Sequence, residues 1–441
     1  MAEYIMLQGT SSHVGKSVLA AALCRIFLQE GKSVVPFKAQ NMALNSYVTA
    51  DGREMGRAQV AQAEAAGLEP TVDMNPVLLK PTGNSCSQVI IDGLSVGNMS
   101  AKEYHNGYAL EAFSAVQNAL SRLTKAYDTL VIEGAGSPAE VNLKTYDIVN
   151  MRVAKYLHAP VLLVADVDRG GSLAALVGTL ALLEEDERDL VKGLIVNKFR
   201  GDVSLFAPAV DFLEKKTGKP VLGVIPYIEN LNIDDEDSVS LEDKPADRQE
   251  GDLDIAVIRL PKISNFTDFD SLQGEGDVSL RYVREAADLG RPDVVILPGS
   301  KNTIEDMAWL QDSGMASSLY QVLSAEGLEG YEIHMGHTAD TEAGLLHPIV
   351  VTERSQQACH VVHGTARRDG LVWGTYMHGI FDNDAFRRDF LNCLRRQKGL
   401  QPLAVWRNFR AEKQKSYDRL AAVVRAHLDM DTLRRIMAGR D

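Results

Sequence analysis

The chain has 441 residues, of which 45% are hydrophobic and 24% charged, a composition typical of globular proteins with several domains. Its formal net charge of −14 leaves no broad basic surface, so we expect neither a nucleic-acid partner nor a membrane partner. No apolar run has the length of a membrane span, and the first residues lack the pattern of a signal peptide. Four scattered cysteines indicate no disulfide framework and no zinc site. These features predict a cytoplasmic protein.

The first motif is a glycine-rich turn between a predicted strand over Tyr4–Leu7 and a predicted helix over Val18–Phe27. It ends in Gly-Lys-Ser, as phosphate-binding loops do, where backbone amides and the helix dipole converge on phosphate oxygens. The strict pattern requires glycine at the position of Thr10, whereas here the glycine comes one residue earlier. We therefore predict a variant loop whose nucleotide contacts are Gly9, Thr10, Ser11, Gly15, Lys16 and Ser17.

Several polar residues then follow predicted strands and suit a magnesium nucleotide. Lys16 would reach the outer phosphates, and the Ser17 hydroxyl would ligate Mg²⁺. Glu133 closes an apolar strand before two glycines and is a second predicted ligand, with Asp51 as a third. Asn197 ends another strand, where its amide either reads a nucleobase edge or belongs to a plain loop. The sequence thus predicts ATP and Mg²⁺ as cofactors.

A candidate substrate segment follows the second predicted strand, over Val34–Phe37. A lysine and several amides at one strand end could bind substrate carboxylates and nucleotide phosphate together. Phosphoryl transfer to a carboxylate is one use of such a site, with catalysis mostly by positioning and charge neutralisation, and this makes Lys38 a candidate catalytic residue. The alternative for each lysine alone is ordinary solvation. The candidate substrate contacts are Lys38, Gln40, Asn41, Asn45 and Lys80.

Strands alternate with helices, which predicts a parallel sheet with its ligands at the carboxyl ends of the strands. Further strands are predicted over residues 129–132, 161–165, 193–196 and 221–225. We expect a first α/β domain over residues 1–228, an acidic and polar linker over 229–252, a second α/β domain over 253–400 and a helical tail over 401–441 that packs on the body.

Ten segments together resemble the cobyric acid synthase family, the glutamine-dependent amidases of cobalamin biosynthesis. They run nearly end to end: Gln8–Ser17, Pro36–Ser46, Met74–Thr82, Val131–Glu140, Asp166–Gly171, Asn197–Asp202, Ile263–Asp270, Leu297–Thr303, Gly330–Gly336 and Trp373–Gly379.

The resemblance implies ATP-dependent amidation of the b, d, e and g carboxylates of adenosylcobyrinic acid a,c-diamide, with ammonia from glutamine. It implies a P-loop NTPase-like first domain, similar to dethiobiotin synthetase. It also implies a second domain similar to class I glutamine amidotransferases, with His378 as the glutaminase base, at the end of a strand predicted over residues 372–377.

One family feature is missing. The nucleophile of the family lies in a Gly-x-Cys-Gly-Gly elbow, and none of Cys24, Cys86, Cys359 and Cys393 has that context. The family places the elbow, its strand and its helix between residues 303 and 330, and we expect this unit to be deleted here. We therefore predict no nucleophilic cysteine, an internally truncated second domain and exposed sheet edges. A defective copy, an ammonia-dependent synthetase and ammonia from another subunit remain as alternatives.

Two other functions are weighed against amidation at these carboxylates. One is a related ligase, such as cobyrinic acid a,c-diamide synthase, against which the Pro36–Ser46 segment argues. The other is a non-catalytic nucleotide switch of the ParA/MinD type, which carries an extra lysine early in its phosphate loop that this loop lacks. The predicted partners are the corrinoid substrate and glutamine or ammonia. The sequence leaves the oligomeric state open.

Overall fold

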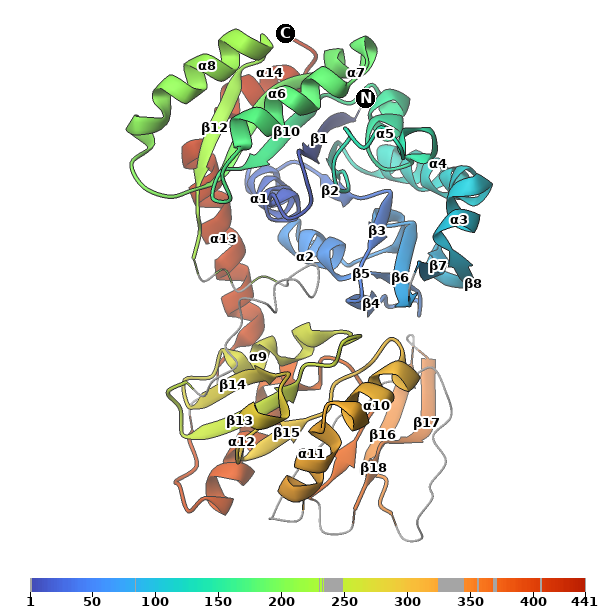
Figure 1. The fold of residues 1–441 in the computed structure, drawn as a ribbon, viewed down its shortest axis with the longest axis vertical. Coiled ribbons are helices and arrows are strands. Elements are labelled where there is room, and N and C mark those ends of the chain that lie inside the picture. Colours follow the sequence, from blue (N-terminus) through green and yellow to red (C-terminus); the bar gives the residue numbers. More distant parts are fainter. Residues whose placement is uncertain are drawn as a thin grey trace.

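The computed structural model describes residues 2–83, 85–229, 231, 233, 249–323, 345–354, 357–367, 371–404 and 407–440. The described residues form two bodies stacked along the long axis of the molecule (Figure 1). The first body comprises residues 2–229 together with the C-terminal helices, and the second comprises residues 249–404. Most of the predicted linker and residues 324–344 lie outside the described residues, and the latter include the last part of the 303–330 region where the elbow is expected.

Six parallel strands form the sheet of the first body, in the order β12-β11-β10-β1-β9-β2. Their bounds are β1 (Glu3–Gly9), β2 (Val34–Phe37), β9 (Thr129–Glu133), β10 (Val161–Asp166), β11 (Val191–Phe199) and β12 (Val221–Pro226). Each predicted strand of this domain is present. β1 lies between β9 and β10, so the loops after all three strands meet at one edge of the sheet.

Helices cover both faces of this sheet because its strands are apolar on both sides. The core of one face includes side chains of α4 (Ala109–Ala126), α5 (Met151–Leu157), α6 (Ser172–Leu182) and α8 (Ala207–Thr217), with α7 (Glu185–Leu190) nearby. The other core includes α1 (Lys16–Gln29) and the C-terminal helices α13 (Phe409–His427) and α14 (Met430–Met437).

The tail therefore consists of two helices that return to the first body. α13 begins at the second body, where the Phe409 amide donates to Asp384 over 3.1 Å. Along α1, Asp418 pairs with Arg25 over 2.8 Å, and Leu420 is fully buried. α13 thus connects the two bodies along one side of the molecule (Figure 1). The helical tail was predicted, but its start at the second body was not.

An excursion between β2 and α4 forms a second, mostly antiparallel sheet that the sequence analysis did not predict. The excursion contains this sheet of four strands, in the order β3-β6-β7-β8, and a separate hairpin of β4 and β5. Its elements are β3 (Gln40–Met42), β4 (Ser46–Val48), β5 (Glu54–Gly56), α2 (Arg57–Ala65), β6 (Val77–Gly83), β7 (Cys86–Ile91), β8 (Leu94–Ser100) and α3 (Ala101–Glu103). This sheet lies between the first sheet and the second body (Figure 1).

The second body has a small parallel sheet in the order β14-β13-β15. Its elements are β13 (Leu253–Ile258), α9 (Asp270–Gln273), β14 (Val278–Val283), β15 (Val294–Ile296), α10 (Thr303–Asp312), α11 (Met315–Leu323), β16 (Ile349–Arg354), β17 (Gln357–His363), β18 (Thr365–Ala366), β19 (Trp373–Gly374) and α12 (Asp384–Gln397).

The strand predicted over residues 372–377 is wrong in its extent. Only Trp373–Gly374 is a strand, and it pairs with β18 rather than with the parallel sheet. Among the described strands, β15 is an edge of that sheet and has three residues.

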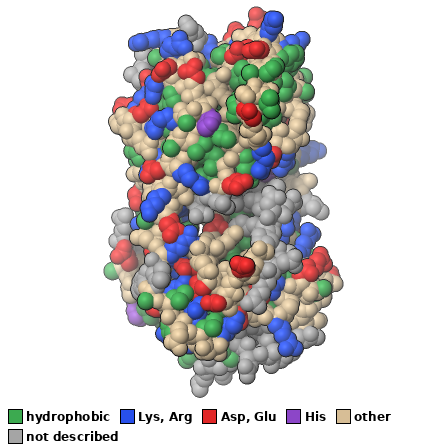
Figure 2. All heavy atoms as spheres, turned by 90° about the vertical axis from the view of Figure 1, so that its left-hand side faces the viewer, with side chains coloured by type: hydrophobic (Ala, Val, Ile, Leu, Met, Phe, Trp, Pro, Cys, Tyr) green, Lys and Arg blue, Asp and Glu red, His purple; other side chains and the backbone are tan. Residues whose placement is uncertain are grey.

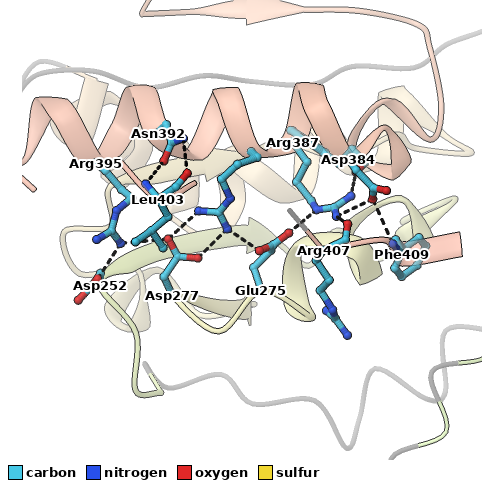
Figure 3. Close-up of polar contacts among 12 residues, drawn as sticks. Asp252, Glu275, Asp277, Asp384, Arg387, Asn392, Arg395, Leu403, Arg407 and Phe409 are labelled. Atoms are coloured by element: carbon cyan, nitrogen blue, oxygen red, sulfur yellow. Dashed lines mark hydrogen bonds and ion pairs between the residues drawn. The ribbon is translucent and has the colours of Figure 1, made fainter. Parts of the chain in front are cut away.

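A buried ion-pair network joins α12 to the start of β14 (Figure 3). Arg387 donates to Glu275 over 2.6 Å, and Arg388 pairs with both Glu275 and Asp277. Arg395 adds a contact to Asp277 over 3.0 Å. These side chains are buried, so removing one partner would leave an uncompensated charge inside the body. The network fixes the last long helix of the second body against its small sheet.

The surface carries charges of both signs. On the face drawn in Figure 2, acidic and basic side chains are interspersed over both bodies rather than gathered into one basic field. Among the residues that the structure describes, no helix combines the length and the apolar character needed to cross a bilayer.

Candidate active site

The phosphate-binding loop connects β1 to α1, and two of its glycines are required by close approaches. A Cβ on Gly9 would lie 2.7 Å from the Ser11 carbonyl oxygen and 2.8 Å from Lys16 Nζ. Gly15 has a φ of 94°, and a Cβ there would lie 2.2 Å from Asn197 Nδ2. The variant spacing thus has a physical reason, because the glycine at position 9 leaves room for the lysine to fold back over the loop.

Lys16 lies over this loop, where its ammonium donates to the backbone oxygens of Ser11 (3.0 Å) and Gly136 (3.2 Å). Thr10 continues the pairing of β1 by donating its amide to Val164 over 2.9 Å. The Asn197 amide donates to the Val14 oxygen over 2.8 Å, so in this structure it braces the loop. The loop residues predicted from the sequence therefore meet at one end of α1.

Glu133 is the centre of the site and is fully buried. Its Oε1 accepts a hydrogen bond from Ser17 Oγ over 2.8 Å and pairs with Lys38 Nζ at 2.9 Å. β9 is the neighbour of both β1 and β2, and this order brings the three side chains together. Lys38 is only 3% exposed, so its charge is held against Glu133 in a low-dielectric environment.

Two residues of this centre were missed in the sequence. Gln62 of α2 donates to Glu133 Oε2 over 2.6 Å, and Gln59 approaches the same oxygen at 3.5 Å. They are three residues apart on a short alanine-rich helix and therefore share one face. The sequence did carry a signal for them: two glutamines three residues apart among alanines lie on one helix face, and buried amides require polar partners such as a carboxylate.

Asp51 is not brought to this centre. Its side chain is 63% exposed at the turn of the β4–β5 hairpin, where it accepts from Thr49 and pairs with Arg53 at 3.3 Å. The turn ties Asp51 to its own hairpin because both partners lie within two residues of it. The structure shows no contact between Asp51 and Ser17 or Glu133, so the predicted three-ligand set is not assembled here.

The predicted substrate residues lie along and beside the excursion. Asn41 donates to Gln59 over 3.1 Å, which links this segment to the Glu133 centre. Gln40 accepts from Tyr104, and Asn45 is fully buried. Lys80 lies further along, where it donates to Ser46 Oγ over 2.9 Å. The segment from Lys38 to Ser46 therefore leads from the phosphate loop to the second body.

His378 lies at the interface between the two bodies. Its Nδ1 is 2.6 Å from an Asp268 carboxylate oxygen, which can only accept, so Nδ1 carries the proton. Nε2 then accepts from Asn265 Nδ2 over 2.9 Å. The Asn265 oxygen in turn accepts from the Ser46 amide of the first body over 2.9 Å. The histidine is thus connected to the predicted substrate segment through Asn265.

The cysteines lie elsewhere. Cys24 is buried in α1, where burial and then the Glu133 carboxylate raise the pKa of its thiol. Cys359 donates to the Val351 oxygen within the β16–β17 pair, and Cys393 is exposed on α12. Cys86 begins β7 in the first body. None of the four makes a contact with His378 in the described part of the chain.

Two protein families match the chain. The CobQ/CobB/MinD/ParA nucleotide binding domain matches residues 5–241. The CobB/CobQ-like glutamine amidotransferase domain matches in two segments, residues 254–328 and 322–386, which meet where the elbow is expected. The predicted fold class is therefore confirmed: a P-loop NTPase-like domain is followed by a glutamine amidotransferase-like α/β domain.

Relatives in other organisms match nearly end to end. A cobyric acid synthase of Pelotomaculum thermopropionicum is 49% identical over 506 aligned positions, which cover 98% of this chain and 96% of the relative. One of Moorella thermoacetica is 47% identical, covering 99% of this chain and 98% of the relative. Since 506 positions exceed the 441 residues of this chain by 65, at least 65 positions of the first relative have no counterpart here. With this identity and coverage, the chain belongs to the cobyric acid synthase family.

Proposed function

We propose that this chain is an ATP-dependent ligase that amidates the b, d, e and g carboxylates of adenosylcobyrinic acid a,c-diamide. The observation that carries the proposal is the buried contact of Glu133 with both Ser17 and Lys38, since it joins the phosphate loop to the substrate segment. A carboxylate of the corrinoid substrate, bound next to Lys38, would attack the terminal phosphorus of ATP, and ADP would leave. Ammonia would then attack the acyl carbon, release phosphate and lose a proton to give the amide.

The residues around Glu133 fit a magnesium ion. Hard oxygen ligands suit Mg²⁺, and Ser17 Oγ and Glu133 Oε1 lie 2.8 Å apart. The side-chain oxygen of Gln62 is buried without a hydrogen-bond partner among the described residues, which a metal-bound water would supply. Mg²⁺ held by Ser17 and Glu133 would neutralise phosphate charge. Lys16 would add its charge at the outer phosphates, and Lys38 would orient the substrate carboxylate.

We further propose that free ammonia is the nitrogen donor. A histidine without a thiolate cannot form the thioester that releases ammonia from glutamine. Support comes from the split of the amidotransferase match and from the Asn265 hydrogen bond that occupies Nε2 of His378. ATP and Mg²⁺ are thus the proposed cofactors, and the corrinoid and ammonia are the proposed partners, in a protein that we propose to be cytoplasmic.

The experiment measures ATP hydrolysis by the purified chain with and without the a,c-diamide and an ammonium salt. A ligase requires both for turnover beyond a slow background. A rate of ATP hydrolysis that does not depend on the corrinoid, and that rises only when a protein partner is added, would instead identify a nucleotide switch.

A further inference from the structure

Charged side chains of the two bodies meet at their interface, away from the phosphate loop. Lys80 of β6 donates to Ser46 Oγ and pairs with Glu54 of β5. Lys301, in the loop before α10, reaches across from the second body and donates to the Gln88 side-chain oxygen on β7. We call these five residues the interface cluster. It is built from two hairpins of the first body, β4–β5 and β6–β7, and from one loop of the second body.

The interface cluster holds one more positive than negative charge. Lys301 makes no ion pair with any residue that the structure describes, and its acceptor on Gln88 is neutral. Burial and then the charge of Lys80 lower the pKa of Lys301 to about 8, against an opposite effect from Glu54. Two ammonium groups so placed repel each other, and a partly buried charge without a counter-charge is unfavourable. The cluster therefore suits an additional anion.

The place of the cluster in the chain indicates which anion. Ser46 ends the segment that begins near Lys38, and Lys38 contacts Glu133 beside the phosphate loop. A molecule lying along this segment would have one end at the phosphate loop and the other at the interface cluster. A corrinoid with several peripheral carboxylates has the anionic groups for both places at once.

We propose that Lys80 and Lys301 together bind a second carboxylate of the corrinoid while another carboxylate faces the phosphate loop. This inference rests on the proposed function and deepens it. The second body then supplies a substrate-binding residue, a role that is independent of glutamine hydrolysis. Lys301 would favour the polycarboxylate substrate over the amidated product, since an amide carries no charge for it to neutralise.

The test measures equilibrium binding of two corrinoids to the full-length chain by dialysis and visible absorbance. One corrinoid is the a,c-diamide and the other is its fourfold amidated product. Lys301→Gln should weaken diamide binding roughly tenfold or more, the value of a hydrogen bond to a charged group. It should leave product binding and binding of a non-hydrolysable ATP analogue unchanged. Lys301→Arg should keep most of the diamide affinity.

Lys262→Gln is the matched control. It removes one charge from the neighbouring loop, where the Lys262 backbone oxygen accepts from the Lys301 amide over 2.9 Å. Equal diamide affinity in Lys301→Gln and Lys262→Gln would overturn the inference and leave the proposed function standing. Equal weakening of diamide and product by both Lys301→Gln and Lys80→Gln would also overturn it, because the cluster would then be structural. No diamide binding by the unaltered chain would overturn both proposals.

Discussion

Removing the lysine of the buried Lys38–Glu133 pair should destabilise the first domain strongly. Lys38→Met leaves a carboxylate with zero exposure facing a hydrophobic group in place of an ammonium 2.9 Å away. Loss of one partner of a buried pair costs about 3–5 kcal/mol. For a domain of this size, about 2–4 °C per kcal/mol gives a drop in midpoint of roughly 6–20 °C. Calorimetry of the full-length chain would follow the transition of the first domain.

The double variant Lys38→Met/Glu133→Gln removes both charges and should be more stable than Lys38→Met alone, because no buried charge remains. Lys32→Met is the control, since Lys32 and Glu3 form a pair that is partly exposed on both sides. Such a pair contributes about 0–1 kcal/mol. A shift for Lys38→Met no larger than that for Lys32→Met would refute the reasoning.

Other expected outcomes concern the nucleotide site and pH. Lys16→Ala should abolish ATP turnover without changing the circular dichroism spectrum. Retained amidation would contradict the assignment of this loop as the ATP-binding site. Glu133→Gln should raise the Mg²⁺ concentration needed for half-maximal activity, and an unchanged Mg²⁺ titration would take Glu133 out of the metal site. The folded-state pKa of Lys301, about 8, lies below the ordinary 10.5, so the protonated group destabilises the fold at pH below 8 and this effect fades between pH 8 and 10.5. Lys301→Gln should therefore raise the thermal midpoint of the ligand-free chain at pH 7 more than at pH 10, and an equal rise at both would contradict this.

The sequence predicted the first sheet well because its strands are short apolar runs between helices, the pattern of a parallel sheet. It also placed Lys38 and Glu133 at strand ends and Ser17 in the phosphate-binding loop, and the order β1-β9-β2 brings them into contact. The excursion was missed partly because β4 and β8 are short or polar and lack the apolar runs on which the prediction depended. β6 and β7 do carry short apolar runs, which the sequence analysis did not assign to a sheet.

The remaining differences come from long-range contacts. Asp51 resembled a metal ligand by its context, but its own hairpin holds it through Thr49 and Arg53. The interface cluster could not be predicted because Lys80 and Lys301 belong to different bodies, and no spacing pattern links them. The strand predicted before His378 is shorter in the structure, because strand formation depends on a pairing partner that a single segment does not reveal.

The measurement that tests the central claim most directly is the source of the amide nitrogen. The purified chain is incubated with ATP, Mg²⁺ and the a,c-diamide, and with either isotopically labelled ammonium or amide-labelled glutamine, and the corrinoid is analysed by mass spectrometry. The account predicts labelled amides from ammonium, more at raised pH where more of it is NH₃, and none from glutamine. Label from glutamine that is lost in His378→Ala would contradict the account, because a cysteine excluded above would then be the nucleophile.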